Sequence, residues 1–271
     1  MKRLRFQVIR LIRALGLLRL ADALRFQKHR LSVAAPNRNF LRRHPGFVPP
    51  PASLAYDAYN HANWEVYWQQ GLGHAQFFAR VFREHLADRP QWDVLEWGCG
   101  PARIIRHLPA ATEGRMRLLA GSDYNPATVA WCRSHLGGIE FHENRLMPPL
   151  PLPEGRFDAV YNHSVFTHLS EEAQLAWAEE LRRVLKPGGI LVCTTHGRSY
   201  QHLLSSDAER ARFSAGQVVV QGRYSEGKKW FFAIHPDRFV TDRLLRQFSW
   251  VAPVSYGSQY GVDQDVWVAR K

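Results

Sequence analysis

The sequence of 271 residues predicts an α/β fold: a doubly wound, mostly parallel seven-stranded sheet preceded by a basic helical N-terminal arm. Three observations predict it. Short apolar strands alternate with amphipathic helices after residue 91, a glycine-rich turn follows the first of these strands, and Lys and Arg gather in the first 44 positions. Strands and helices that alternate with short links form a parallel sheet with helices on both faces.

Residues 94–103 predict a buried strand that ends in Glu96, then a glycine-rich turn and the first turn of a helix. Gly98 and Gly100 let the backbone turn tightly and let a ligand approach main-chain N–H groups. Pro101 suits the first turn of a helix, where its missing N–H costs nothing. This order is typical of a nucleotide-type binding loop, although a tight turn without a ligand explains the loop alone equally well.

The alternation continues along the chain. A second strand over residues 117–123 ends in Asp123, 23 residues after Gly100, and a carboxylate at this spacing takes ribose hydroxyls. The further elements expected are helices over 127–136, 170–185 and 239–248, strands over 139–142, 157–163 and 190–195, and closing antiparallel strands over 250–256 and 265–269.

Composition divides the chain into three parts. Residues 1–44 carry a charge of +11 out of the total of +12 and predict a basic amphipathic helical arm. Residues 45–90 predict a proline linker and aromatic-rich lead-in helices, whose aromatic side chains either pack over the sheet or wall a pocket. Residues 91–271 form the main domain, and its long segment 197–235 is expected over the ligand crevice as a substrate-side insertion.

Several motifs, taken together and in order, resemble the class I S-adenosylmethionine-dependent methyltransferases. They are Glu96-Trp97-Gly98-Cys99-Gly100, Gly121 to Pro126, Phe157 to Tyr161 with Val165 to Leu169, and Leu181 to Gly189. The resemblance implies S-adenosyl-L-methionine as cofactor and methyl transfer as the reaction. In detail it is nearest to bacterial enzymes linked to surface sugars and lipids, which implies O-methylation of a small-molecule, sugar or lipid-linked acceptor.

The resemblance also implies a cofactor role for nine residues. Glu96, Gly98, Cys99 and Gly100 would face the amino acid part of the cofactor, Asp123 the ribose hydroxyls, Tyr124 the adenine ring, Asn144 the adenine edge, and Tyr161 and His163 the methyl sulfonium. In place of the third glycine of the usual loop stands Ala102.

A hydroxyl acceptor must lose its proton near the transferred methyl group. His163 and His196 end the fourth and fifth strands, and an imidazole titrates in the useful range, so both are candidate general bases. His168, His202 and His235 are further candidates. The alternative is that each histidine lines the pocket or bonds a backbone carbonyl.

Two other functions compete with this interpretation. An NAD-type oxidoreductase requires Gly-x-Gly-x-x-Gly, and Arg103 stands at the third glycine position. The second is a nucleotide-fold binding or scaffold protein, which would bind a ligand at the loop and catalyse no reaction.

The three cysteines, Cys99, Cys132 and Cys193, show neither metal-ligand spacing nor a disulfide framework. We therefore expect no metal site and a reducing cytoplasmic setting.

The arm is patterned as well as charged. Its apolar side chains repeat on one face of a predicted helix: Leu4, Val8, Leu11, Ile12, Leu15 and Leu18. No run reaches the roughly 20 apolar residues that span a bilayer. The face either packs on the domain or on a second copy in a homo-oligomer, or it lies on an anionic membrane, which for a cytoplasmic protein is the inner membrane surface. A nucleic-acid role is disfavoured because aromatic residues for base stacking are sparse.

Overall fold

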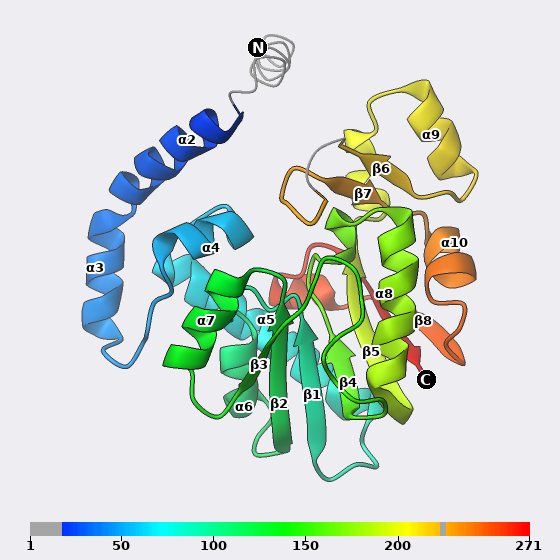
Figure 1. Ribbon diagram of the computed structural model, residues 1–271, viewed down its shortest axis with the longest axis horizontal. Coiled ribbons are helices and arrows are strands. Elements are labelled where there is room, and N and C mark those ends of the chain that lie inside the picture. The colour runs from blue at the N-terminus through cyan, green and yellow to red at the C-terminus, as the bar shows by residue number, and fades with distance from the viewer. Residues whose placement is uncertain (1–17, 223–225) are drawn as a thin grey trace. The chain divides into compact units, whose positions relative to one another are not determined.

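The computed structural model describes residues 18–222 and 226–271. The chain forms two compact units, Met1–Tyr67 and Trp68–Lys271, which we call the N-terminal unit and the C-terminal unit (Figure 1). The division falls inside a helix, α5 (Trp64–His85). It therefore coincides with neither of the boundaries at residues 44 and 90 that composition indicated.

Aromatic packing holds the described part of the N-terminal unit together. Its helices are α2 (Leu18–Ser32), α3 (Ala34–Arg43), α4 (Ala52–Tyr59) and the first turn of α5. The ring of Phe26 on α2 lies 5.1 Å from that of Tyr56 on α4, and Phe40 on α3 lies 5.3 Å from Phe47. These rings therefore pack within the unit. The helical face expected over residues 4–18 lies outside the described residues except for Leu18.

The C-terminal unit contains the predicted seven-stranded sheet, in the order β3-β2-β1-β4-β5-β9-β8. The first five strands of this order are parallel, while β9 runs antiparallel to both β5 and β8. The strands are β1 (Trp92–Trp97), β2 (Met116–Asp123), β3 (Glu140–Glu143), β4 (Phe157–Tyr161), β5 (Leu185–Thr195), β8 (Trp250–Val254) and β9 (Asp265–Arg270). The doubly wound fold class is thus confirmed.

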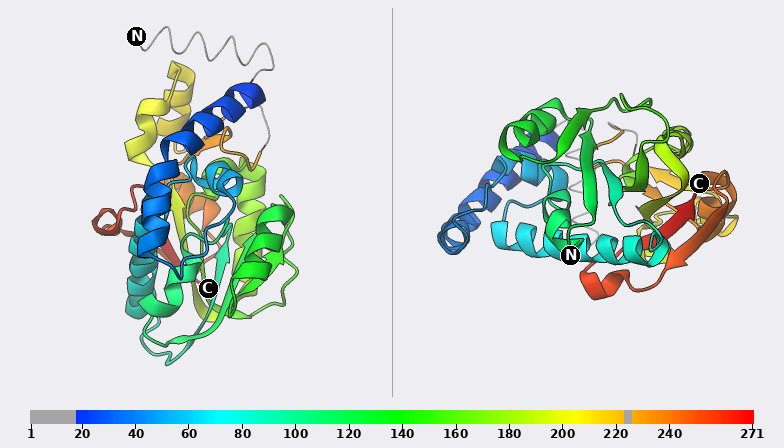
Figure 2. Two further views of the ribbon diagram at one scale, coloured as in Figure 1. Left: turned by 90° about the vertical axis from the view of Figure 1, so that its left-hand side faces the viewer. Right: turned by 90° about the horizontal axis from the view of Figure 1, so that it is seen from below.

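Helices cover both faces of this sheet because its strand residues alternate between two cores. Leu95 and Val160 belong to a core shared with α8 (Glu171–Val184), whereas Val94 and Ala159 pack with α5, α6 (Leu108–Ala111) and α7 (Pro126–His135). Figure 1 shows α8 in front of the sheet and α5 behind it, and the right-hand view of Figure 2 separates the two layers. Parallel strands covered on both faces are buried throughout, as the burial of all six residues of β1 shows.

Two local predictions need correction. The turn after β1 leads into a 3-10 helical turn (Ile105–His107) that continues as α6 from Leu108, so Pro101 lies in the turn and not in the first turn of the helix. The helix expected over 239–248 is shorter, consisting of α10 (Asp237–Phe239) and a π-helical turn (Val240–Leu244). The insertion 197–235 has its own structure, with α9 (Asp207–Ser214) and a two-stranded sheet of β6 (Val219–Gln221) and β7 (Phe232–Ile234).

Candidate functional site

The glycine-rich loop after β1 is bonded to the end of β2. Gly98 and Gly100 adopt φ of +74° and +51°, so both need the freedom of glycine. The N–H groups of Gly98 and Cys99 donate to the Ser122 carbonyl at 2.8 and 2.9 Å, and that of Gly100 donates to Oδ2 of Asp123 at 2.9 Å. These three donors hold the turn together. The approach of a ligand to this loop stays a prediction.

Asp123 lies at the carboxyl end of β2, beside this loop. Its Oδ2 accepts from Gly100 and its Oδ1 accepts from the Asn125 N–H, both at 2.9 Å. A carboxylate oxygen has room for a second hydrogen bond, so this group can still accept ribose hydroxyls. The backbone N–H of Asn144, after β3, donates to the Asp123 carbonyl at 3.1 Å. The buried Oδ1 of Asn144 has no hydrogen-bond partner in the described chain, which fits an acceptor for an adenine amino group.

Tyr124 contacts the insertion. Its hydroxyl donates to the Gly227 carbonyl at 3.0 Å, and Nζ of Lys228 lies 5.0 Å from its ring centroid. The same segment is tied to α8, because Oε1 of Glu226 accepts from the Ser170 N–H at 2.6 Å. Residues 226–228 therefore lie beside the edge of the sheet where the adenine contacts were predicted.

Glu96 is buried at the end of β1. Its Oε2 accepts hydrogen bonds from the Ile105 N–H at 3.1 Å and from the Tyr161 hydroxyl at 2.9 Å. Burial raises the pKa of Glu96 to about 8, although the Tyr161 hydrogen bond and the charge of Arg103 oppose this shift. The side chain is therefore largely a neutral acid at pH 7. Two of the predicted site residues, Glu96 and Tyr161, are thus in direct contact.

Two residues of this loop, Ala102 and Arg103, stand at positions where related loops carry glycine. Ala102 has φ of +63°, a left-handed conformation that glycine adopts without strain. Arg103 is buried and donates to Oε1 of Gln70 on α5 at 2.6 Å. A Cβ on Gly71 would lie 2.1 Å from the Arg103 carbonyl oxygen. Helix α5 thus supplies the glycine that permits close packing against the loop, and no local motif signalled this pairing.

The two candidate bases lie at the same edge of the sheet. The ring of His163 stacks on that of His74 with centroids 4.5 Å apart, and Nε2 of His74 lies 2.9 Å from the Gly261 carbonyl. His196 lies between the rings of Tyr200 and Phe232, at 3.9 and 4.6 Å. Burial lowers the pKa of His163 well below its usual value and that of His196 to about 3, so both rings are neutral at pH 7.

The three further histidines are bonded elsewhere. His168 contacts the Phe231 carbonyl through Nδ1 at 2.7 Å, and His235 contacts Oε1 of Gln174 through Nε2 at 3.1 Å. His202 is exposed and contacts the Ser199 carbonyl at 2.8 Å. Their bonds explain their positions without a catalytic role. Sequence reasoning missed His74, which contacts His163 from a distant helix.

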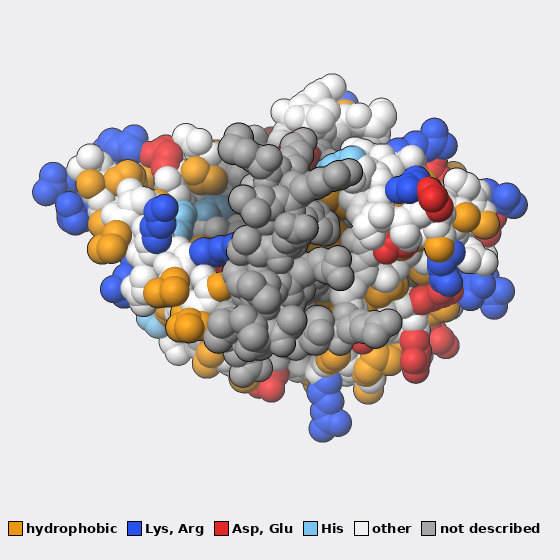
Figure 3. Space-filling model, turned by 90° about the horizontal axis from the view of Figure 1, so that it is seen from above, with side chains coloured by type: hydrophobic (Ala, Val, Ile, Leu, Met, Phe, Trp, Pro, Cys, Tyr) orange, Lys and Arg blue, Asp and Glu red, His pale blue; other side chains and the backbone are white. Residues whose placement is uncertain are grey.

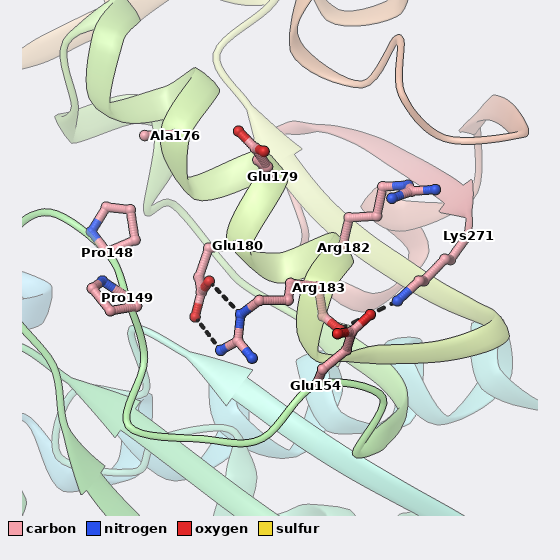
Figure 4. Close-up of a pocket in the computed structure, with 9 residues that line it drawn as sticks. All are labelled: Pro148, Pro149, Glu154, Ala176, Glu179, Glu180, Arg182, Arg183 and Lys271. Carbon is pink, nitrogen blue, oxygen red and sulfur yellow. Dashed lines mark hydrogen bonds and ion pairs between the residues drawn. The ribbon is translucent and has the colours of Figure 1, made fainter.

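A separate cavity of about 470 Å³ lies on the outer side of α8 (Figure 4). Arg183 lines the cavity and forms an ion pair with Glu180 at 2.7 Å. Lys271 lines it too, and its Nζ donates to the Leu185 carbonyl at 2.7 Å. Glu154 lies just before β4 and Leu185 begins β5, so the cavity is at the amino ends of the strands. Ligands of doubly wound sheets bind outside the carboxyl ends. This cavity is therefore distinct from the candidate site.

Comparison with known proteins identifies the domain type. Residues 94–189 match the family described as "Methyltransferase domain". A probable S-adenosylmethionine-dependent methyltransferase of Mycolicibacterium smegmatis is 37% identical over 109 residues, which are 39% of this chain and 38% of that protein. A ubiquinone biosynthesis O-methyltransferase of Cereibacter sphaeroides is 31% identical over 109 residues, 39% of this chain and 42% of that protein. The chain thus spans about two fifths of the length of these relatives.

Solved structures share the fold at low sequence identity. DesVI of Streptomyces venezuelae superposes with a TM-score of 0.53 at 15% identity, covering 76% of this chain and 94% of that one. CalS10 of Micromonospora echinaspora, an amino pentose methyltransferase, gives a TM-score of 0.51 at 17% identity, covering 76% and 95%. At these identities the likeness supports the fold and not the substrate.

The left-handed Ala102 gives a test of the loop geometry. We expect Ala102→Gly to change the free energy of unfolding little, because relief of about 1–2 kcal/mol of backbone strain offsets the loss of a buried methyl group and the added freedom of the unfolded chain. Ala159→Gly, at an equally buried alanine in β4, should cost about 1.5 kcal/mol because no strain is relieved there. Urea unfolding of both variants measures the difference, and equal costs would contradict the strained geometry.

Proposed function

Residues 94–189 belong to the S-adenosylmethionine-dependent methyltransferase family, and we propose that the chain transfers the cofactor's methyl group to a hydroxyl oxygen of a small-molecule, sugar or lipid-linked acceptor. The observation that carries the proposal is the juxtaposition of Asp123 with the glycine-rich loop, joined by the bond from Gly100. A carboxylate at the carboxyl end of β2 can accept hydrogen bonds from the ribose hydroxyls. The name of the ubiquinone biosynthesis O-methyltransferase supports oxygen as the acceptor atom.

The residues at the site fit such a cofactor. In this proposal Asp123 accepts the ribose hydroxyls, Asn144 accepts from the adenine edge, and Tyr124 packs on the adenine ring. Glu96 and the loop of Gly98, Cys99 and Gly100 line the amino acid part. Tyr161 and His163 lie beside the reacting centre. When bound, S-adenosylmethionine supplies an electrophilic methyl group on a sulfonium, and the protein holds the acceptor oxygen in line with it and keeps water out.

Of the two candidate bases, His163 is placed better to take a proton. His163 is a half-buried residue, and its ring stacks on that of His74. His196 instead contacts the side chain of Gln264 through Nε2 at 3.1 Å. The low pKa of His163 keeps it unprotonated well below pH 6.5, so it is available throughout the neutral range.

The N-terminal unit supports a proposal about the setting of the reaction. Leu20, Leu24 and Leu31 share one face of α2 and are 58%, 63% and 74% exposed. Lys28 and Arg30 are exposed on the same helix. Figure 3 shows Lys and Arg side chains among hydrophobic ones along the N-terminal unit, at the left of the view. An exposed leucine stripe bordered by cations suits an anionic membrane surface, where a lipid-linked acceptor would lie. None of the helices described is long and apolar enough to cross a bilayer.

Replacement of Asp123 tests cofactor binding and turnover together. Asp123→Ala should weaken S-adenosylmethionine binding by about 1–3 kcal/mol in calorimetry, because ribose hydroxyls lose their acceptor. It should also abolish transfer of radiolabelled methyl groups to acceptors in a cell extract. Asp88→Ala, an exposed carboxylate before β1 at the opposite edge, is the control. Unchanged affinity in Asp123→Ala, or tighter binding of NADH, refutes the cofactor assignment. Binding without any labelled product favours a binding protein without turnover.

The raised pKa of Glu96 predicts proton release on cofactor binding. The cofactor's positive charges favour the carboxylate, so the pKa of about 8 should fall when it binds. Affinity should therefore rise with pH below 8, by at most about tenfold per unit, and level off above. Glu96→Gln cannot ionise, so the part of the pH dependence of affinity that comes from residue 96 should be absent in this variant. Titration of the cofactor's own amino group affects both proteins alike. Identical pH profiles for the two proteins would place Glu96 away from the cofactor's charge.

Vesicle sedimentation tests the leucine stripe. Replacing Leu20, Leu24 and Leu31 by Gln should weaken binding to vesicles that contain phosphatidylglycerol at least about tenfold, because each buried leucine contributes roughly 1.5–3 kcal/mol. Binding should fall with added salt and be weak on pure phosphatidylcholine. Leu203→Gln, an exposed leucine of the C-terminal unit, should change nothing. If the triple variant instead loses a dimer or precipitates, the stripe packs against protein.

A further inference from the structure

The side chain of Gln264, just before β9, joins four residues at the carboxyl edge of the sheet, and one of them is Tyr200, with which it shares a hydrogen bond. Its Oε1 lies 2.5 Å from Oγ1 of Thr194. Its Nε2 lies 2.9 Å from Oγ of Ser164 and 3.1 Å from Nε2 of His196. Thr194 and His196 belong to β5 and its end, and Ser164 follows β4. One amide thus connects the ends of the strands on the acceptor side.

The directions of these hydrogen bonds follow from the neighbours. The Ser164 N–H donates to Oγ1 of Thr194 at 2.7 Å, so the Thr194 hydroxyl proton is available for Gln264. A separation of 2.5 Å suits a hydroxyl that donates to an oxygen and is short for an N–H donor. Oε1 of Gln264 therefore faces Thr194, and its two N–H groups are shared among Ser164, His196 and Tyr200. Nε2 of His196 must then accept, which places the ring proton on Nδ1.

The surroundings hold this arrangement in place. The His196 ring is stacked between Tyr200 and Phe232, and a Cβ on the following Gly197 would lie 1.5 Å from Oδ2 of Asp265. Ser164 has φ of +62°, a strained conformation that persists only where its surroundings fix it. Nδ1 of His196 is buried and lies outside normal hydrogen-bond geometry. Burial lowers the pKa of the ring, and the Ala233 carbonyl opposes this shift.

We propose that Gln264 is a positioning residue that holds His196 as the Nδ1–H tautomer, so that this imidazole can donate at Nδ1 but cannot take the acceptor's proton at Nε2. The inference deepens the proposed function by removing one of its two candidate bases. It assigns His196 to the wall of the acceptor site, and it leaves proton removal to His163 or to water.

The tautomer can be read directly by nitrogen NMR on protein labelled with ¹⁵N in its histidine rings, with the His196 signals assigned by their loss in His196→Gln. In the wild type we expect a protonated Nδ1 and an unprotonated Nε2 at pH 7, unchanged down to about pH 5. The other titratable groups that act on this ring are His235, His168 and His163, whose signals are followed in the same spectra, and Tyr200, which stacks on the ring.

Gln264→Glu reverses the hydrogen bond, because a carboxylate accepts where the amide donated. His196 should switch to the Nε2–H tautomer, and its pKa should rise by about 1–3 units beside the new charge. Gln264→Leu removes the donor and should give a mixture of tautomers. Gln259→Glu, an exposed glutamine in the same connection, should leave the His196 signals unchanged.

A wild-type spectrum with the proton on Nε2 overturns the proposal without any variant, even if Gln264→Glu fails to fold. A tautomer that stays on Nδ1 in both Gln264 variants also overturns it, since another group would then set the tautomer. The spectra need neither cofactor nor acceptor. Failure of this inference is therefore distinguishable from failure of the methyltransferase assignment, which rests on binding and labelled product.

Discussion

Two buried carboxylates shape the candidate site by accepting hydrogen bonds from the backbone of the loop after β1. Asp123 accepts from Gly100, and Glu96 accepts from Ile105. The loop runs over the carboxyl ends of β1 and β2, where its N–H groups would be unpaired and buried without these acceptors. Because each carboxylate ends a strand, the sheet fixes both, and they in turn fix the loop. The side chains that the methyltransferase resemblance assigned to the cofactor thus also shape the candidate site.

Because these carboxylates also bind the loop, the sequence predicts where they lie better than it predicts which groups they bond. Strand periodicity and the acid at the end of each strand locate Glu96 and Asp123, since strand order and direction follow from local pattern. The direction of the loop N–H groups does not follow, because it depends on how closely the loop approaches Ser122. A motif identifies which residues meet, whereas the packing of the chain decides which of their atoms are engaged.

The residues that sequence reasoning missed depend on pairings across long stretches of chain. Gly71 packs on Arg103, His74 stacks on His163, and Gln264 bonds His196. In each pair one partner stands in or next to a motif, while the other lies on α5 or before β9, where nothing local distinguishes it. The expected helix over 239–248 is shorter because the chain leaves the helical path after Leu244.

The electrostatics of the acceptor side agree with the proposed reaction. Burial holds His74, His163 and His196 neutral, and Arg103 is the fixed charge that depresses the pKa of His74 and His163 further. Transfer of a methyl cation from a sulfonium to a neutral oxygen spreads positive charge and creates no new pair of charges. Buried neutral imidazoles therefore do not penalise the transition state. Early proton transfer to an imidazole would create a charge there, so we expect the hydroxyl proton to leave late, after the new carbon–oxygen bond has begun to form.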